Sequence, residues 1–401
     1  MIDIDCGFEY EYDVTPTNRR TDMAGNPLAR LADLGQSVWY DFIRRDLIAS
    51  GTLAKYIEQD RLAGMTSNPT IFQQAIAGSD LYDEEIRSAP RELAPKALFE
   101  SLAIKEIRAA ADLFRPVYDH TGGKDGHVSL EVAPSLAHDT AATVSEARRL
   151  FQACDRPNVM IKIPGTREGL PAIETCLAEG ININVTLLFS EERYIDVMEV
   201  WLRAMEQRAD HGLPVDRVAS VASFFVSRSD GKVDKAIDVR LKKLKSAADR
   251  SRLSAQKSKL GIANARMAYQ AWIRTIRDTP RYHRLREEGA AAQRPLWAST
   301  STKNPSLPDI YYIEALAGPD TVNTVPPHTY EAYRDHGEPE ARVEHDLEEA
   351  QAAFVTLEEF GIDFAAISSD LEKEGVAGFA ESFETLLESI TTKREQIDRP
   401  A

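Results

Sequence analysis

The chain has 401 residues, of which 43% are hydrophobic, and a net charge of −16 at pH 7. This length and hydrophobic content allow a large buried core, while the acidic balance argues against a nucleic-acid-binding protein, which needs clustered basic surface. Three cysteines (Cys6, Cys154 and Cys176) are too few and too scattered to predict a disulfide framework or a zinc site.

Short runs rich in β-branched and aromatic residues alternate with amphipathic stretches along the chain. The runs predict strands over Ser37–Ile43, Gly64–Asn68, His127–Ala133, Asn158–Ile163, Ile181–Phe189, Val218–Val226, Pro295–Thr300 and Thr321–Val325. The amphipathic stretches predict helices over Leu47–Glu58, Ala97–Val117, Thr140–Cys154, Glu168–Glu179, Glu191–Arg208, Ala255–Arg277 and Ile310–Leu316. Such alternation indicates a parallel sheet, and eight strand–helix units closed into a ring form a TIM barrel.

An open doubly wound sheet is the competing architecture. It would need a glycine-rich phosphate turn after the first strand, and the segment from Tyr40 to Arg44 contains no glycine. We therefore expect an α/β protein whose residues 1–401 form a single TIM (β/α)8 barrel domain.

The two ends of the chain lack strand patterns. Residues 1–25 are polar and irregular and are predicted to form an N-terminal arm. Residues 338–401 are predicted as helices, over Glu340–Glu359, Leu371–Lys373 and Gly378–Ile397. We interpret them as the last barrel helix and a C-terminal extension packed on the outside of the barrel.

Lys162 lies in an apolar run, Asn158–Gly165, that is typical of a buried strand. Burial disfavours the ammonium form of lysine and lowers its pKa. A neutral lysine amine is a nucleophile toward carbonyl carbons and can form a Schiff base. Lys162 is thus either half of a structural ion pair or the carrier of the chemistry.

Side chains alternate between the two faces of a strand, so each strand of a barrel has a lumen face and a helix-facing face. In the fifth strand, Ile181, Ile183, Val185 and Leu187 are expected to face the helices. The lumen side is predicted to receive Trp39, Asp41, Ser129, Glu131, Met160, Lys162, Asn182, Asn184 and Thr186. TIM-barrel active sites lie at the C-terminal ends of the strands, where several of these polar groups fall. Separate structural roles would require each buried group to find its own partner, at a cost of about 1–3 kcal/mol when one is missing. A shared functional site is therefore favoured.

With these residues at one barrel mouth, the chain resembles the transaldolase family from about Leu34 to about Pro327. The matching segments are Gly35–Asp41, Thr66–Thr70, Val128–Val132, Met160–Thr166 and Gly180–Ser190. Each segment alone is weak, but all of them in order and at barrel spacing are specific.

The resemblance implies transfer of a dihydroxyacetone unit in the pentose phosphate pathway. Sedoheptulose 7-phosphate and glyceraldehyde 3-phosphate would give erythrose 4-phosphate and fructose 6-phosphate. It further implies that Lys162 forms the Schiff base and that Glu131 moves protons through a water held by Thr186. Asp41 would exchange the proton of the C4 hydroxyl as the C3–C4 bond breaks or forms. Asn68 and Asn184 would bind the dihydroxyacetone hydroxyls.

The expected phosphate-binding residues follow the sixth and seventh strands. Ser223 and Arg228 stand in a segment that resembles the one gripping phosphate in the family, although a surface salt bridge is the alternative role for Arg228. Lys303 would be the second cation, with Ser299 as a hydroxyl partner. Ser301 stands where related sequences often have glycine, which we expect to reduce phosphate affinity.

Three further side chains stand near the expected barrel mouth. Trp39 and Phe225 are candidates for lining the pocket or for the core, and His138 is expected to be a loop histidine without a catalytic role.

No cofactor or metal is expected, because a protonated imine is itself the electron sink. One alternative is a fructose 6-phosphate aldolase that releases dihydroxyacetone; those relatives are shorter and use a tyrosine as acid/base. The other is a non-catalytic sugar-phosphate-binding barrel, which would lack the lysine or a carboxylate.

The expected partners are small-molecule sugar phosphates, with no nucleic acid and no membrane, and the chain would be a monomer or homodimer. No apolar stretch approaches the roughly 20 residues of a membrane span and no secretory signal is evident, so we expect a cytoplasmic protein.

Overall fold

The computed structural model describes residues 25–397. Its strands are β1 (Gln36–Tyr40), β2 (Gly64–Met65), β3 (His127–Glu131), β4 (Val159–Pro164), β5 (Ile183–Leu188), β6 (Ser220–Phe225), β7 (Arg294–Ala298) and β8 (Thr321–Val325). They pair in chain order, all parallel, and β8 closes the ring onto β1. The expected TIM barrel is confirmed. Of the expected N-terminal arm, residues 1–24 lie outside the described part of the chain.

The barrel is surrounded by helices. They are α1 (Pro27–Asp33), α2 (Arg45–Ala49), α3 (Thr52–Gln59), α4 (Pro69–Ala77), α5 (Asp83–Ser88), α6 (Pro95–His120), α7 (Thr140–Cys154), α8 (Gly169–Ala178), α9 (Glu191–Asp210), α10 (Ser227–Leu241), α11 (Ala247–Ser254), α12 (Leu260–Trp272), α13 (Pro280–Glu287), α14 (Tyr311–Ala315), α15 (Pro327–His336), α16 (Leu347–Glu359) and α17 (Phe364–Ile397). Several helices begin at a side chain that accepts a backbone N–H of the first turn, as Asn26, Asn68, Asp139, Ser190 and Thr279 do.

The expected helix over Ala255–Arg277 is wrong at its start. The chain turns after α11, and α12 begins only at Leu260. Ser258 in this turn has a φ of +58° and donates from its backbone N–H and its hydroxyl to Asp234, at 2.9 and 3.0 Å. Residues rarely adopt this conformation inside a helix, so the contact with Asp234 sets the boundary.

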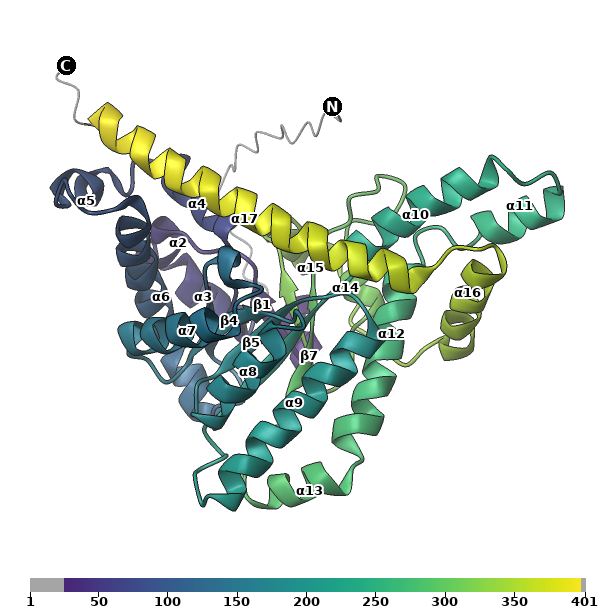
Figure 1. Cartoon of the computed structure of the whole chain (residues 1–401), viewed down its shortest axis with the longest axis horizontal. Coiled ribbons are helices and arrows are strands. Elements are labelled where there is room, and N and C mark those ends of the chain that lie inside the picture. Colours follow the sequence, from purple (N-terminus) through teal and green to yellow (C-terminus); the bar gives the residue numbers. More distant parts are fainter. Residues whose placement is uncertain (1–24, 398–401) are drawn as a thin grey trace.

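The expected arrangement of the C-terminal segment also needs correction. Helix α15 directly follows β8, so it takes the place of the last barrel helix that had been assigned to residues 340–359. Helix α17 is continuous from Phe364 to Ile397, whereas two separate segments had been expected. It does not simply cover the outside, because it crosses the barrel mouth (Figure 1) and packs against β5, α4, α6 and α10.

Apolar side chains fill the lumen below and around the mouth. They are Trp39, Ala63, Met160, Leu187, Phe189, Val221, Phe225, Leu296, Ala298, Val322, Leu371 and Phe379. Gly64 leaves room for the largest of them, since a Cβ there would lie 2.6 Å from the Trp39 ring. The presence of Leu187 in this cluster contradicts its expected helix-facing position. Pairing of β5 with β6 shifts register between Val185 and Leu188, and Leu187 has a φ of +60°. This bulge reverses the alternation of side chains beyond Thr186.

A buried ion pair lies at the N-terminal end of the barrel. Arg294 on β7 donates to Asp125, at 2.8 Å, and to the hydroxyl of Ser37, at 2.7 Å. Burial by itself would raise the pKa of Asp125, but the Arg294 charge and the hydrogen bonds hold it below its ordinary value. His127 lies next to this pair, and its Nε2 is 2.8 Å from the carbonyl oxygen of Gly123.

We expect His127 to make folding stability pH-dependent. Burial lowers its pKa to about 4 in the folded chain. In the unfolded chain it would bind a proton below about pH 6.5, so stability is full above that pH and falls as the pH drops toward 4. Between pH 7 and pH 5 the expected loss from this group is about 2 kcal/mol. Urea unfolding at both pH values checks this: the difference between the two free energies should be smaller in His127→Gln than in the unmodified chain. Equal differences in the two proteins would contradict the assignment.

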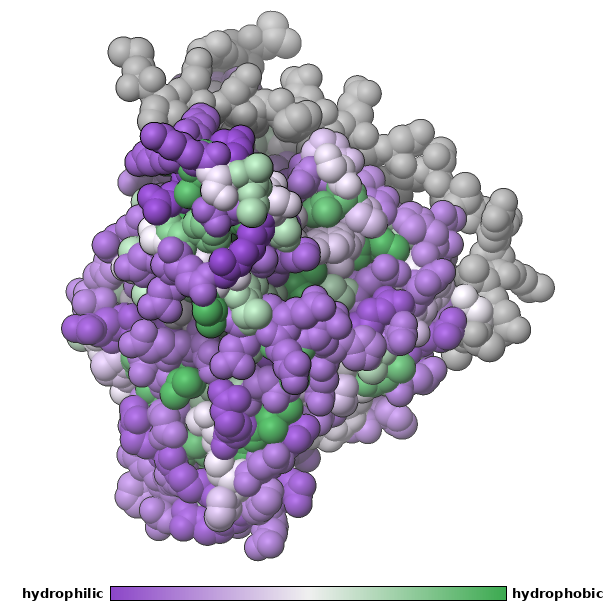
Figure 2. Space-filling model, turned by 90° about the vertical axis from the view of Figure 1, so that its right-hand side faces the viewer, coloured by the Kyte–Doolittle hydropathy of each residue, from purple (hydrophilic) through white to green (hydrophobic). Residues whose placement is uncertain are grey.

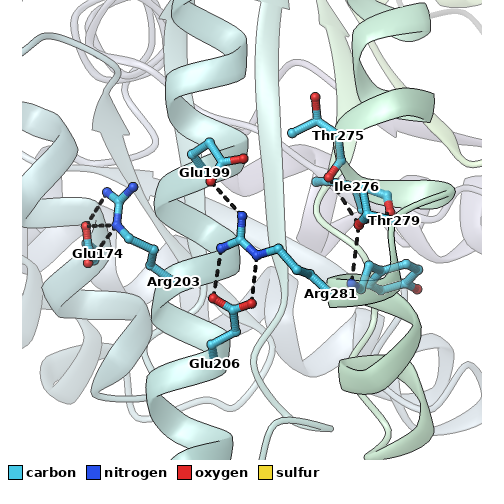
Figure 3. A network of polar contacts seen from close by, with 9 residues as sticks. Glu174, Glu199, Arg203, Glu206, Thr275, Ile276, Thr279 and Arg281 are labelled. Atoms are coloured by element: carbon cyan, nitrogen blue, oxygen red, sulfur yellow. Dashed lines mark hydrogen bonds and ion pairs between the residues drawn. The ribbon is translucent and has the colours of Figure 1, made fainter.

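The outer surface carries networks of opposite charges. In Figure 3, Arg281 of α13 lies between Glu199 and Glu206 of α9, at 2.7 and 2.8 Å, and Arg203 of α9 contacts Glu174 of α8. These side chains are 23–49% exposed, so each pair contributes at most about 1 kcal/mol. On the side of the molecule that carries α10, α11 and α16, hydrophobic residues form only small patches among hydrophilic ones (Figure 2).

Candidate active site

Adjacent strands bring the central residues of the site into register. Glu131 on β3 pairs with Lys162 on β4, and Lys162 pairs with Asn184 on β5. Because these strands are parallel and in register, their lumen-facing side chains lie side by side. The Lys162 Nζ is 3.5 Å from Glu131 Oε2, and the two side chains are only 6% and 3% exposed. Lys162 therefore faces the lumen and not the surrounding helices.

Two further groups contact the amine of Lys162. Its Nζ donates to the carbonyl oxygen of Ser67, at 3.3 Å. The same nitrogen lies 5.8 Å from the centre of the Phe379 ring, on α17. One carboxylate, one carbonyl and one aromatic face thus surround the amine inside the barrel.

Asp41 directly follows β1 and lies on the same cavity as Lys162. The hydroxyl of Thr66 donates to Asp41 Oδ1 at 2.6 Å. Burial raises the pKa of Asp41 above its ordinary value, against the opposing effects of the Lys162 charge and of this hydrogen bond. Burial also raises the pKa of Glu131, again opposed by Lys162 and reinforced by Asp41. Carboxylates whose pKa is raised toward neutrality are better proton acceptors at physiological pH.

Three buried oxygens near Lys162 have no hydrogen-bond partner among the described residues. They are Oε1 and Oε2 of Glu131, the second of which is the oxygen ion-paired with Lys162, and Oγ1 of Thr186. Nearly all buried polar atoms in proteins are hydrogen-bonded to the protein or to water. These oxygens are therefore the ones available to a ligand or to an ordered water.

The two predicted asparagines are held in different ways. Asn68 caps α4, and its Oδ1 accepts from the backbone of Ile71 at 2.9 Å, which leaves its amide hydrogens for a ligand. Asn184 is fully buried, its Nδ2 donates to Ser129 at 3.1 Å, and its Oδ1 accepts from Ser223 at 2.7 Å. Ser223 therefore contacts Asn184, the residue that pairs with Lys162 on the next strand.

A cavity of about 130 Å³ lies at the C-terminal end of the strands. It is lined by Asp41, Thr66, Asn68, Lys162, Thr186, Ser223, Phe225, Arg228, Ala298, Ser299, Ser301, Lys303, Thr324, Pro326 and Phe379. Every predicted site residue is in this set except Glu131 and Asn184. Those two contact lining residues, Glu131 through Lys162 and Asn184 through Ser223.

Besides Lys162, two cations line the cavity: Arg228, in the first turn of α10, and Lys303, in the loop after β7. The Arg228 guanidinium lies over the rings of Phe225 and Phe379, at 5.4 and 5.9 Å, and burial lowers its pKa. Within residues 25–397 no carboxylate lies within ion-pair distance of Arg228, so the alternative role in a surface salt bridge is not observed. The hydroxyl of Ser299 is 2.9 Å from that of Ser227.

The sequence did not predict some of the residues that line the cavity, and it left undecided whether Trp39 and Phe225 line the cavity or belong to the core. Phe379 was not predicted to reach the site, although Leu371, Gly375 and Phe379 repeat at the spacing of one helix face. Phe225 lines the cavity, whereas Trp39 lies in the lumen core.

His138 was expected to be a loop histidine. It is exposed and lies 3.1 Å from Glu168, away from the cavity lining.

The family described as Transaldolase/Fructose-6-phosphate aldolase matches residues 38–390. The chain belongs to this family. The match continues beyond Pro327, where the resemblance noted in the sequence ended, and includes most of α17.

Named relatives cover nearly the whole chain. Transaldolase 2 of Nostoc punctiforme is 46% identical over 375 residues, which are 92% of this chain and 98% of that protein. A transaldolase of a Parafrankia species is 46% identical over 377 residues, 94% of this chain and 99% of that protein. Transaldolase 2 of Streptomyces coelicolor is 44% identical over 372 residues, 92% of this chain and 98% of that protein. The expected family and enzyme class are confirmed.

Two properties of residues 25–397 bear on ligands and partners of this transaldolase-family chain. None of the helices there combines the length and the apolar character needed to cross a bilayer. No three His, Cys, Asp or Glu side chains there are grouped so that they would hold a metal ion.

Proposed function

We propose that this chain is a transaldolase that moves a dihydroxyacetone unit from a ketose phosphate to an aldose phosphate through a Schiff base on Lys162. The observation that carries the proposal is the buried amine of Lys162, 3.5 Å from Glu131, in a cavity that also contains Asp41 and Arg228. The names of relatives at 44–46% identity support transfer rather than simple cleavage.

In the first half-reaction, the Lys162 amine attacks the C2 ketone of the donor and forms a carbinolamine. Loss of water from this adduct needs a proton on the departing hydroxyl, which Glu131 supplies. The unpartnered oxygens of Glu131 and Thr186 support a water bridge between them, because buried oxygens of this kind are normally hydrogen-bonded. The product is a protonated imine.

Asp41 acts next, as the base for the C4 hydroxyl. When it takes this proton, the C3–C4 bond breaks, the electron pair moves into the imine, and the aldose phosphate leaves. The resulting enamine attacks the aldehyde carbon of the acceptor, and Asp41 returns the proton to the new hydroxyl. Water then adds to the product imine, and its C–N bond breaks to release the ketose phosphate and regenerate the Lys162 amine. The raised pKa of Asp41 supports this exchange, because a carboxylate with a pKa nearer to neutrality is a better proton acceptor at neutral pH.

The remaining polar residues fit the two ends of an extended sugar phosphate. Asn68 and Asn184 bind the dihydroxyacetone hydroxyls. The hydrogen bond from Ser223 to Asn184 supports a place for Ser223 at this end, rather than with the phosphate as the resemblance implied. Arg228, Lys303 and Ser299 bind the phosphate.

Sugar phosphates are accordingly the proposed partners, with neither nucleic acid nor membrane involved. The proposed location is the cytoplasm, the proposed assembly is a monomer or homodimer, and the proposed unit is one barrel domain over the chain.

Borohydride reduction in the presence of fructose 6-phosphate tests this function. We expect a stable dihydroxyacetone adduct on the peptide that contains Lys162, identified by mass spectrometry. We also expect rapid consumption of fructose 6-phosphate only when erythrose 4-phosphate is added, because a transferase needs an acceptor. Equal consumption without the acceptor would favour the aldolase alternative, and absence of any adduct would favour the non-catalytic barrel.

A further inference from the structure

Phe379 is the aromatic side chain of α17 that reaches the cavity. It is 6% exposed, and its ring centre lies 5.8 Å from the Lys162 amine and 5.9 Å from the Arg228 guanidinium. One ring thus contacts the cation at the imine end of the site and a cation proposed for the phosphate end. A ligand that extends between these two groups passes against the Phe379 ring.

The backbone of α17 is held close to the strand ends at this point. One turn before Phe379, Gly375 faces Leu187, and a Cβ on Gly375 would lie 2.9 Å from that side chain. The close approach therefore depends on the absence of a side chain at Gly375 and on the bulge that turns Leu187 toward the lumen.

Ion pairs and hydrogen bonds fix α17 on both sides of the mouth. Toward its start, Lys232 of α10 contacts Glu374 at 2.6 Å. Toward its end, Lys393 contacts Asp83 at 2.9 Å, and Arg394 donates to the carbonyl oxygen of Leu93 at 2.9 Å. With these contacts on both sides of Phe379, α17 is held across the barrel mouth, and Phe379 lies over the cavity.

We propose that Phe379 is a positioning residue that shields the enamine on Lys162 from bulk solvent and orients Arg228, so that the dihydroxyacetone unit is transferred rather than released. This inference rests on the proposed transaldolase function. The contact that orients Arg228 is a cation–π interaction, which strengthens as the guanidinium is desolvated.

The shielding matters at one stage of the reaction. After the first product leaves, the enamine either attacks an acceptor aldehyde or takes up a proton at its nucleophilic carbon. Protonation gives the imine of dihydroxyacetone, to which water adds at C2. The C–N bond then breaks, free dihydroxyacetone leaves, and the lysine amine is regenerated. Excluding bulk solvent from the site, apart from the water proposed between Glu131 and Thr186, suppresses protonation of the enamine and with it this release.

The test measures two products from fructose 6-phosphate and erythrose 4-phosphate: sedoheptulose 7-phosphate, formed by transfer, and free dihydroxyacetone. In Phe379→Ala we expect the ratio of released to transferred dihydroxyacetone to rise at least about tenfold, because the cavity opens to water. In Phe379→Leu, which keeps an apolar cover, the ratio should stay within about threefold of the unmodified enzyme. We also expect the preference for fructose 6-phosphate over fructose, as kcat/KM, to fall in both variants, since neither keeps the ring under Arg228.

Phe383→Ala is the matched control, because Phe383 lies one turn further along α17. It packs against Phe99, with ring centres 5.6 Å apart, and does not line the cavity. An unchanged product ratio in Phe379→Ala, or an equal rise in Phe383→Ala, would overturn the proposal.

If Phe379→Ala does not fold, Phe379→Val replaces it. The product ratio of Phe379→Val should lie above that of Phe379→Leu. A ratio at or below that of Phe379→Leu would overturn the proposal. Absence of transfer by the unmodified chain would instead reject the proposed function itself.

Discussion

Replacement of Lys162 by arginine should reduce turnover by roughly 10⁴-fold or more, because a guanidinium does not form an imine at neutral pH. The Lys162 amine lies 3.5 Å from Glu131, and arginine keeps a cationic side chain at this position. The loss would therefore report on the nucleophile and not on removal of an ion pair. Steady-state transfer from fructose 6-phosphate to erythrose 4-phosphate measures it.

Arginine is larger than lysine, and the site is almost fully buried, so folding of the variant has to be verified. Thermal unfolding followed by circular dichroism provides this check. Lys162→Met, which is uncharged and close to the size of lysine, is the second variant and should also show no borohydride adduct. Turnover near the unmodified rate in either folded variant would exclude Lys162 as the Schiff-base residue.

Replacement of Glu131 by glutamine should slow imine formation by about a hundredfold or more, the usual effect of losing a positioned acid/base group. Glutamine has nearly the same shape but neither gives nor takes protons at neutral pH. Imine formation is followed in a single turnover, by quenching with borohydride at successive times. The alkaline side of the pH–rate profile should change as well. Loss of water from the carbinolamine needs the protonated form of Glu131, and burial raises the pKa of Glu131, so this activity is lost, as the pH rises, at a higher pH than for an ordinary glutamate.

Glu168→Gln is the matched control for this experiment. Glu168 lies in the segment after β4, and its carboxylate lies 3.1 Å from the exposed His138, away from the cavity lining. The same chemical change there should leave imine formation unaffected. An unchanged rate in Glu131→Gln, or equal slowing in both variants, would mean that the proton relay runs through another group.

The strands and their lumen faces were predictable from the sequence, because side chains on a strand alternate with a period of two. That period alone placed Glu131, Lys162, Asn184 and Thr186 on one side of their strands. The register pairs Glu131 with Lys162 and Lys162 with Asn184, as the expected shared site required. Asp41 and Arg228 follow β1 and β6, so their place at the mouth follows from the barrel itself.

Helix boundaries were less predictable, because long-range contacts decide them. The start of α12 depends on hydrogen bonds between Ser258 and Asp234, which are far apart along the chain. Likewise, the strand expected over Gly64–Asn68 ends at Met65, and Asn68 instead caps α4.

The sequence by itself determined the barrel, the strand faces and the polar groups at the mouth, since all of these depend on local periodicity and chain order. Only the tertiary structure decided what covers that mouth. The bulge at Leu187 reverses a local alternation, and α17 reaches the cavity from more than two hundred residues beyond Lys162 in the sequence. The physical reason is packing: the close approach at Gly375 and the place of Phe379 between two cations arise from surfaces that meet only when the barrel is complete.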